Sequence, residues 1–333
     1  MGKMKAVLLR GHGGTDVMEI GEAPMPEVRE GEVLIRVRAF GLNRADLLQR
    51  RGQYPPPPGV PDIPGLEAAG IVAALGPGVK RVRVGDPVCV LLPGGGYAEY
   101  AAAPEGMVMP VPEGLSLEEA AAIPEAFLTA FLNLFRLGKL RAGETVLIHA
   151  GASGVGTAAI QLANLAGGRV LVTAGSAGKL KLCRELGAQD GWNYHDGSFR
   201  DWVRQATGGR GADLVLDLVG GPYLQDNLFS LAPDGRLVVV GTMGGASAEN
   251  IHLGLLLTRR LRILGTTLRS QPVETKIRLT QSFMHGWLPA FRTKRLVPVI
   301  DSVWDWTRLR EAHEHMEAGR NLGKIVLRIP HES

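Results

Sequence analysis

The spacing of hydrophobic and polar residues changes near residue 116. Before that point, short apolar runs are broken by Gly and Pro, and "EVLIRVRAF" (32–40) alternates, with Val33, Ile35 and Val37 on one face. A period of two is typical of a half-buried strand. The runs "AAGIVAALG", "DPVCVLL" and "YAEYAAA" follow at strand length, with glycine-rich turns between them. This part of the chain therefore predicts a β-rich barrel, and "YPPPPG" (54–59) predicts an extended loop in it.

The second pattern begins with a helix start, since "SLEE" is a capping box with Ser116 as N-cap. Continuous apolar runs then alternate with helix-like segments. The strand-like runs are "TVLIHA" (145–150), "RVLVTA" (169–174), "DLVLDLV" (213–219) and "RLVVVG" (236–241). The helix-like segments are "GTAAIQLANLAG" (156–167), "GKLKLCRELGA" (178–188) and "SFRDWVRQATGG" (198–209), the last with Ser198 as expected N-cap. This alternation predicts an α/β fold with a doubly wound parallel sheet covered on both faces. We expect "RILGTTL" (262–268) to be an edge strand and "NLGKIVLRI" (321–329) to return to the first domain.

Composition sets the limits of these expectations. A chain of 333 residues is too long for one ordinary core and suits two domains. The net charge is only +4, and the chain contains no dense Lys/Arg block. Both observations disfavour nucleic acid as the main partner. Only two cysteines, Cys89 and Cys183, are present, which suits a reducing compartment. With no apolar start and "LGLLLT" (253–258) as the most apolar window, we expect a soluble cytoplasmic protein with no membrane partner.

The stretch "HAGASGVG" (149–156) allows two interpretations. As a nucleophile elbow, Gly-x-Ser-x-Gly, it has Val155 where the last glycine belongs, and no His follows a later strand in a matching context. As a dinucleotide-binding loop, Gly-x-Gly-x-x-Gly, it has Ser153 where the middle glycine belongs. The flanking strand and helix suit both motifs, but the missing partners make a hydrolase the weaker interpretation.

The dinucleotide interpretation accounts for more of the residues. Gly151 suits the tight turn, Gly154 lets the backbone approach a phosphate, and Gly156 suits close packing of helix on strand. The first helical amides, Val155 included, form an anion site. The Ser153 hydroxyl can hydrogen-bond the pyrophosphate. The competing interpretation is a glycine-rich turn that binds no ligand.

The end of the second strand selects the cofactor. NAD sites usually carry an acidic residue there, about 20 residues past the glycines. Here "RVLVTA" ends in Gly175-Ser176, with Lys179 in the next turn and Tyr194 after the third strand. Ser176, Lys179 and Tyr194 can all contact a 2′-phosphate, so NADPH is expected. An N-cap role for Ser176 and a solvated helix position for Lys179 are the simpler alternatives.

Zinc is not expected, because two isolated cysteines and no His pair at helical spacing are too few ligands. At this point the chain resembles the medium-chain dehydrogenase/reductase superfamily, in its zinc-free quinone oxidoreductase (zeta-crystallin-like) branch. The resemblance rests on "FGLNRADLLQRRGQYPPPPG", "IPGLEAAGIVAALGPGV", "HAGASGVGTAAIQLA", "VTAGSAGKL" and "NLGKIVL". The stress-induced NADPH:quinone oxidoreductase subgroup is the most similar. In zinc members of the superfamily a Cys ligand stands where this chain has Asn43, and a His ligand stands where it has Leu66.

The resemblance implies a GroES-like domain (1–124 and 267–333) and a Rossmann domain (125–266), with an active site in the cleft between them. It places Asn43, Thr129, Gly241 and Met243 near the nicotinamide and Asn321 over the cofactor. It places Gly175, Ser176, Lys179 and Tyr194 near the 2′-phosphate and Tyr54 at the pocket mouth.

The expected reaction is zinc-independent reduction of a quinone by NADPH. A quinone needs little activation, because adding hydride restores aromaticity, so the protein mainly orients the reactants. Tyr54 and Asn43 are the expected donors to the quinone oxygen, with Ser153 within reach of pyrophosphate or substrate. Packing alone for Tyr54 and a structural amide for Asn43 stay open, as do two other functions, an alkenal/enone reductase and a non-catalytic NADPH-binding structural protein. The edge strand and the resemblance together predict a homodimer.

Overall fold

A computed structural model describes residues 2–249 and 251–330. The chain forms two compact units, which are described separately below. Unit 1 comprises Met1–Leu128 and Arg269–Ser333, and unit 2 comprises Thr129–Leu268.

Unit 1 is built on β-structure. Its larger sheet has the order β14-β15-β3-β4-β5-β7, with β6 also pairing with β3, and β1 and β2 form a separate antiparallel pair. No pairing joins the end strands β14 and β7 within the described residues, so the predicted barrel is not closed by hydrogen bonds. The strands are β1 (Lys3–Leu9), β2 (Met18–Pro24), β3 (Glu32–Leu42), β4 (Glu67–Leu75), β5 (Pro87–Leu91), β6 (Tyr100–Pro104), β7 (Val108–Pro110), β14 (Ile300–Asp305) and β15 (Lys324–Arg328).

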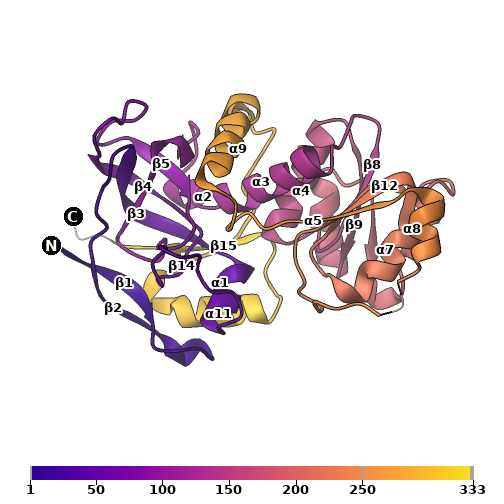
Figure 1. Ribbon diagram of the computed structural model, residues 1–333, viewed down its shortest axis with the longest axis horizontal. Helices are drawn as coiled ribbons and strands as arrows, with labels where there is room; N and C mark the ends of the chain where they lie inside the picture. The colour runs from indigo at the N-terminus through magenta and orange to yellow at the C-terminus, as the bar shows by residue number, and fades with distance from the viewer. Residues whose placement is uncertain (1, 250, 331–333) are drawn as a thin grey trace. The chain divides into compact units, whose positions relative to one another are not determined.

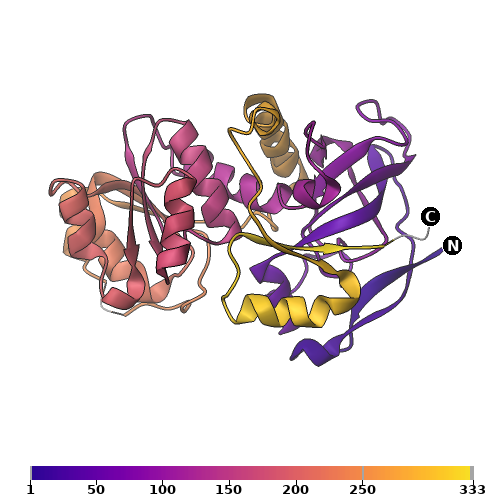
Figure 2. The same ribbon diagram turned by 180° about the vertical axis from the view of Figure 1, so that it is seen from behind.

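The core of unit 1 follows from the alternation in β3. Val33, Ile35 and Val37 are fully buried, as the period of two predicts. The returning segment β15 pairs antiparallel with β3, which confirms that the chain comes back to the first unit. Figure 2 shows α11 in yellow beside β14 and β15. The helices are α1 (Arg44–Arg50), α2 (Leu117–Ala120), α9 (Val273–Gly286), α10 (Pro289–Arg292) and α11 (Leu309–Glu317), with α3 (Pro124–Phe131) crossing into unit 2.

Unit 2 is a six-stranded parallel sheet with the order β10-β9-β8-β11-β12-β13. Figure 1 shows α4 and α5 on one side of this sheet and α7 and α8 on the other, which is the predicted doubly wound arrangement. The strands are β8 (Thr145–Ile148), β9 (Arg169–Ala174), β10 (Asp190–Asn193), β11 (Ala212–Asp217), β12 (Leu231–Val239) and β13 (Arg262–Gly265). The helices are α4 (Gly154–Leu165), α5 (Ala177–Glu185), α6 (Arg200–Ala206), α7 (Leu224–Ser230) and α8 (Leu253–Arg259).

This strand order places a topological switch between β8 and β11. The chain runs outward from β8 through β9 to β10, then returns to β11 on the other side of β8. Ligands of open α/β sheets bind at such a switch, outside the carboxyl ends of the strands. A cofactor site in unit 2 is therefore expected at the loops after β8, β9, β11 and β12.

Two helix starts test the cap predictions. Ser116 is the N-cap of α2, and its hydroxyl accepts from the Glu119 amide while Glu119 accepts from the Ser116 amide. The prediction for Ser198 is wrong by one residue, because Phe199 is the N-cap of α6. The Ser198 hydroxyl still accepts from the Arg200 amide at 3.2 Å, so it caps the same turn from outside.

One helical run is more apolar than the sequence analysis allowed. Leu117–Leu137 is long and apolar enough to cross a membrane by length and composition, which the choice of "LGLLLT" as the most apolar window overlooked. However, 78% of its most apolar window is buried inside the structure. A core helix passes the same test, so the run is explained by packing.

Candidate cofactor and active site

The loop after β8 turns sharply into α4. Ala150 adopts a left-handed conformation with φ +51°, and Ser153 is the N-cap of α4. The Ser153 hydroxyl accepts from the Gly156 amide at 3.0 Å. The Gly154 and Val155 amides lie in the first helical turn, where no intrahelical acceptor exists. Ser153 therefore takes up one free amide and leaves two for an anion, which fits the pyrophosphate of a dinucleotide.

The glycines of this loop are required by close contacts. A Cβ on Gly156 would lie 2.3 Å from the Ala150 carbonyl oxygen, and one on Gly151 would lie 3.0 Å from Val172 and from the Cys183 sulfur. Real Cβ atoms essentially never come as close as the first of these distances. Gly156 is therefore needed for the turn of the loop into α4, and Gly151 for its close packing on β9 and α5, as the dinucleotide interpretation requires.

The end of β9 carries the residues expected at a 2′-phosphate. A Cβ on Gly175 would lie 2.2 Å from the Tyr194 hydroxyl, so the phenol packs directly on the Gly175 backbone. Ser176 is the N-cap of α5 and accepts from the Lys179 amide at 3.3 Å. Ser176 and Tyr194 are exposed, and Lys179 is half-buried. The four residues thus gather at one strand end, within unit 2, and Ser176 has the N-cap role that was its simpler alternative.

A buried hydrogen-bond network that sequence reasoning missed joins the carboxyl ends of β8, β9 and β11. His149 Nδ1 lies 2.8 Å from the Thr173 hydroxyl, and His149 Nε2 lies 2.6 Å from Asn227 Oδ1. Asn227 Nδ2 donates to Asp217 at 3.0 Å, and Asp217 also accepts from the amides of the turn after β11, including Val219 at 2.7 Å. Figure 1 shows these strands side by side.

The network fixes its own proton positions. Because the Asn227 amide nitrogen donates to Asp217, its oxygen must accept, so His149 Nε2 carries the proton and Nδ1 accepts from Thr173. Burial lowers the pKa of His149 to about 4, which keeps the imidazole neutral, and burial raises the pKa of Asp217. The network holds the strand ends beneath the candidate cofactor loops in one arrangement.

The remaining expected cofactor residues of unit 2 belong to other segments than the glycine loop. The Gly241 amide lies 3.3 Å from the Asp217 carbonyl oxygen, just after β12, and Met243 is 48% exposed on the same loop. Thr129 is buried in α3 and accepts from the Asn133 side chain through its carbonyl oxygen. Gly241 and Met243 thus follow a strand at the switch-point edge, as a nicotinamide contact requires.

In unit 1, Asn43 belongs to a buried ionic cluster. Lys324 forms an ion pair with Glu67 at 2.5 Å, and its ammonium also donates to Asn43 Oδ1 at 2.6 Å and to the Leu42 carbonyl oxygen at 2.9 Å. The Asn43 amide nitrogen donates to Glu67 at 2.9 Å. The second Glu67 oxygen accepts from the Glu125 amide at 2.8 Å. The second hydrogen of the Asn43 side-chain nitrogen is donated to the Gly41 carbonyl oxygen at 3.3 Å. Both ends of the side-chain amide are therefore occupied, and a role as donor to a substrate requires one of the nitrogen's two bonds to open.

Asp46, at the start of α1, supports this cluster from below. Its carboxylate accepts from the Asn43 backbone amide at 2.8 Å, from the Tyr97 hydroxyl at 2.9 Å and from the Gly65 backbone amide at 3.2 Å. Burial raises the pKa of Asp46 to about 6, while these donors and Lys324 oppose the rise. The bonds fix the turn that presents Asn43.

Tyr54 lies at a bend in a loop that a buried arginine holds in place. Arg269 donates to the Tyr54 carbonyl oxygen at 3.2 Å, to the Gln49 side chain at 2.7 Å and to the Pro93 carbonyl oxygen at 2.7 Å. Its guanidinium also lies 5.2 Å from the centre of the Tyr54 ring. Burial raises the pKa of the Tyr54 phenol, with Arg269 opposing, so the hydroxyl stays protonated and can donate.

Asn321 is the last expected residue of unit 1. Its side chain donates to the Gly323 carbonyl oxygen at 2.8 Å, in the segment that leads into β15. For metal ions, the described parts of the chain contain no group of three or more His, Cys, Asp or Glu side chains that could hold one. Leu66 is buried, next to Glu67.

Two family models match the chain, one within unit 1 and one mainly within unit 2. "Alcohol dehydrogenase GroES-like domain" matches residues 29–113, and "Zinc-binding dehydrogenase" matches residues 154–282. The quinone oxidoreductase of Rattus norvegicus is 33% identical and covers 97% of both chains. The chain belongs to the medium-chain dehydrogenase/reductase superfamily. Another relative from Rattus norvegicus, the synaptic vesicle membrane protein VAT-1 homolog, is 32% identical over 97% of this chain and 84% of its own length.

Solved structures agree on the fold of this medium-chain dehydrogenase/reductase. The crystal structure of an NAD-dependent alcohol dehydrogenase is 34% identical, with a TM-score of 0.86 over 98% of this chain and all of its own. A mycobacterial protein complexed with NADPH is 31% identical, with a TM-score of 0.86 over 98% of this chain and 99% of its own. The expected combination of a Rossmann-like sheet and a β-rich GroES-like domain is therefore confirmed, as is the superfamily.

Proposed function

We propose that this protein is a zinc-independent, NADPH-dependent quinone oxidoreductase. The observation that favours NADPH over NADH is the end of β9, where Gly175 and Ser176 stand in place of an acidic residue. Tyr194 and Lys179 lie beside them. An acidic residue there would repel a 2′-phosphate, whereas a lysine and two hydroxyls suit it. Quinone as acceptor rests on the relatives named quinone oxidoreductase and on the chain's own motifs, and so does the finer placement in the stress-induced subgroup.

In this proposal unit 2 binds the dinucleotide. The Gly154 and Val155 amides hold the pyrophosphate, and Ser153, whose oxygen caps α4, keeps its hydrogen for donation to a phosphate oxygen. Gly241 and Met243 flank the nicotinamide. When bound, the nicotinamide supplies the hydride. The buried His149 network holds these loops and takes no part in the reaction.

Unit 1 supplies the polar groups for the acceptor. The protonated Tyr54 phenol donates a hydrogen bond to a quinone oxygen, which stabilises the negative charge that develops there. Asn43 is a second donor only if its side-chain nitrogen gives up its bond to Glu67 or the longer one to the Gly41 carbonyl oxygen. We therefore assign the donor role first to Tyr54 and a positioning role to the Asn43 cluster.

The 2′-phosphate assignment predicts the effect of Lys179→Ala. Removing the ammonium should raise the apparent KM for NADPH at least about tenfold, because a charge-assisted hydrogen bond is worth about 1.5–3 kcal/mol. The KM for NADH should change less than about twofold by the same reasoning. Steady-state kinetics with both cofactors checks this, with Lys181→Ala on the same helix as the control. Equal effects on the two cofactors would remove Lys179 from the phosphate site.

The acceptor assignment predicts the effect of Tyr54→Phe. The ring and its contact with Arg269 stay, but the hydroxyl is lost, so kcat/KM for quinone should fall about tenfold or more. The Kd for NADPH, measured by fluorescence titration, should not change. Unchanged turnover would leave Tyr54 with a packing role alone.

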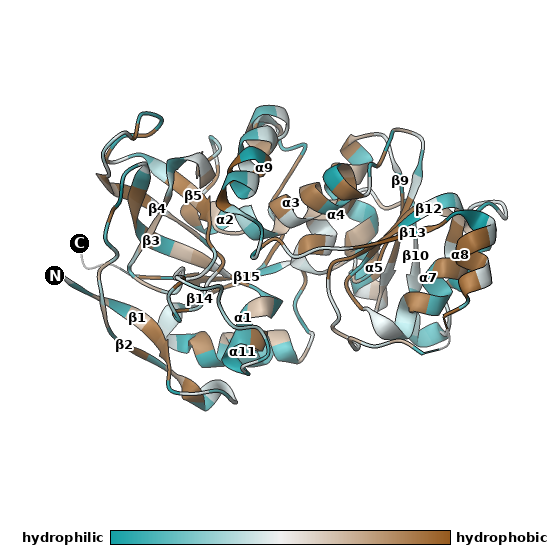
Figure 3. Ribbon diagram, in the orientation of Figure 1, coloured by the Kyte–Doolittle hydropathy of each residue, from teal (hydrophilic) through white to brown (hydrophobic). Residues whose placement is uncertain are grey.

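We also propose a homodimer formed along the edge strand β13. Ile263 on β13 and Leu253 and Leu257 on α8 are exposed, the leucines by 70% and 78%. Figure 3 shows the hydrophobic colour along α8. Pairing of two β13 strands would extend the sheet and cover these side chains.

As a separate proposal, the protein works in the cytoplasm.

The dimer proposal predicts that Leu257→Arg shifts the protein to monomers. A charge at the centre of the apolar contact is costly to bury, so sedimentation velocity should show the monomer at concentrations where the parent protein is a dimer. Val84→Arg is the control, since Val84 is also exposed but lies in unit 1. A parent protein that sediments as a monomer would contradict the proposal.

A further inference from the structure

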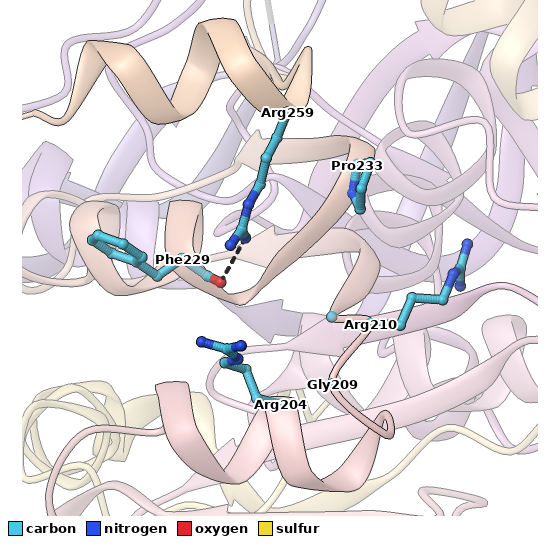
Figure 4. Close-up of a pocket in the computed structure, with 7 residues that line it drawn as sticks. Arg204, Gly209, Arg210, Phe229, Pro233 and Arg259 are labelled. Carbon is cyan, nitrogen blue, oxygen red and sulfur yellow. Dashed lines mark hydrogen bonds between the residues drawn. The ribbon is translucent and has the colours of Figure 1, made fainter.

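A pocket lined by arginines lies in unit 2, away from every residue assigned above. Its volume is about 320 Å³, at the lower end of small-molecule sites. Figure 4 shows it between α6, α8 and the loops before β11 and at the start of β12. Its lining consists of Arg204, Gly209, Arg210, Gly211, Phe229, Pro233 and Arg259, and we call it the arginine pocket.

The arginine pocket and the cofactor loops lie at opposite edges of the parallel sheet. Gly209 to Gly211 precede β11, and Pro233 lies near the start of β12. The candidate cofactor residues follow the carboxyl ends of β8, β9 and β12. Because these strands are parallel, their two ends lie a strand length apart, so one ligand cannot occupy both places.

Two guanidinium groups converge on the pocket from different helices. Figure 4 shows Arg259 reaching in from α8 and Arg204 from α6, with their charged ends facing one another. Arg259 is held there, since it donates to the carbonyl oxygens of Phe229 at 3.1 Å and Leu231 at 3.0 Å. Arg204 is exposed, and none of the described residues accepts a hydrogen bond from its side chain. Like charges placed this way repel unless an anion lies between them.

The surrounding charges leave this repulsion uncompensated. Arg200 adds a third cation, stacked 4.0 Å over the Phe229 ring, and its buried Nε has no hydrogen-bond partner in the part of the chain that the structure describes. The carboxylate of Asp213 is already paired with Arg210 through bonds of 2.6 and 2.9 Å. The C-termini of α6 and α8 contribute about half a negative charge each. Arg204 and Arg259, the two lining arginines outside ion pairs, therefore leave the pocket positive.

We propose that the arginine pocket is a binding site for a small phosphate-bearing anion. Guanidinium groups bind phosphate oxygens in pairs of parallel hydrogen bonds, and two facing arginines suit a phosphate or pyrophosphate group between them. The glycines beside Arg210 leave room for the group, and Pro233 offers apolar surface to an attached organic part. This site is separate from the proposed cofactor site and does not depend on it.

Titration calorimetry with inorganic pyrophosphate on protein saturated with NADPH tests the proposal. We expect one saturable site whose affinity falls at least about tenfold in Arg204→Glu and in Arg259→Gln, since hydrogen bonds to charged groups are worth about 1.5–3 kcal/mol. Arg204 is exposed and its side chain donates no hydrogen bond to any described residue, so its variant should fold normally. Arg169→Glu is the matched control, because Arg169 is exposed at the same edge of the sheet, at the start of β9. This substitution should change the affinity for pyrophosphate less than about twofold.

The same titration on Lys179→Ala without cofactor separates the two sites. If pyrophosphate binding still depends on Arg204 there, the arginine pocket is the site even if the NADPH proposal fails. Absence of saturable binding, or equal affinity in the parent, Arg204→Glu and Arg169→Glu proteins, would overturn the proposal.

Discussion

Lys324→Met should lower the free energy of unfolding by about 3–5 kcal/mol, the largest effect we expect from a single substitution. Lys324 is 4% exposed and Glu67 is fully buried, so methionine would leave the Glu67 carboxylate without its counterion in the core of unit 1. Asn43 would also lose the donor to its side-chain oxygen. Urea unfolding of the parent and variant proteins measures the difference.

Two controls make this prediction specific. Lys3→Met removes another lysine–glutamate ion pair, with Glu22 at 2.7 Å, but both side chains are about 70% exposed, so less than about 1 kcal/mol should be lost. The double variant Lys324→Met/Glu67→Gln should recover much of the stability, because the Gln oxygen can accept from the Glu125 amide and its nitrogen can donate to Asn43 Oδ1 once the Asn43 side-chain amide turns over. If Lys324→Met cost no more than Lys3→Met, the cluster would not be the fixed element that we describe.

Gly156→Ala should weaken NADPH binding at least about tenfold and destabilise the protein by about 2 kcal/mol. The added Cβ would lie 2.3 Å from the Ala150 carbonyl oxygen and 2.6 Å from that of Gly151, so the backbone of the loop must move. That movement displaces the Gly154 and Val155 amides, which the proposal assigns to the pyrophosphate. Fluorescence titration with NADPH and urea unfolding measure the two effects.

Gly178→Ala is the matched control for this substitution. Gly178 lies in α5, and a Cβ there would meet no heavy atom within 4 Å. The same chemical change should therefore leave NADPH binding intact and stabilise the helix by about 0.5–1 kcal/mol. Tight NADPH binding by Gly156→Ala would contradict the placement of the cofactor on this loop.

The fold followed from local patterns. The period of two in β3 and the continuous apolar runs of β8, β9, β11 and β12 are visible in the sequence, because side-chain burial dictates them. Ser153 was a harder case. Its place in the motif suggested contact with the cofactor, and the structure adds a second reason for a serine, the capping of the Gly156 amide.

The chemistry of the candidate site depended on contacts that no local pattern contains. Asn43 and Lys324 are separated by 281 residues, and His149 and Asn227 by 78. Neither a lysine in a strand nor a histidine in the turn after one reveals its partner, so the buried ion pair and the network under the cofactor loops could not be predicted. The arginine pocket likewise needs the sheet to bring α6 and α8 together.

The central claim is that this medium-chain dehydrogenase/reductase passes hydride from NADPH to a quinone. The most direct test is the loss of NADPH absorbance when purified protein is mixed with para-benzoquinone, beside parallel reactions with NADH and with an alkenal acceptor. We predict quinone-dependent oxidation with kcat/KM at least about tenfold higher for NADPH than for NADH, and slower turnover of the alkenal. NADPH that binds without being oxidised, a preference for NADH, or reduction of the alkenal alone would contradict the account.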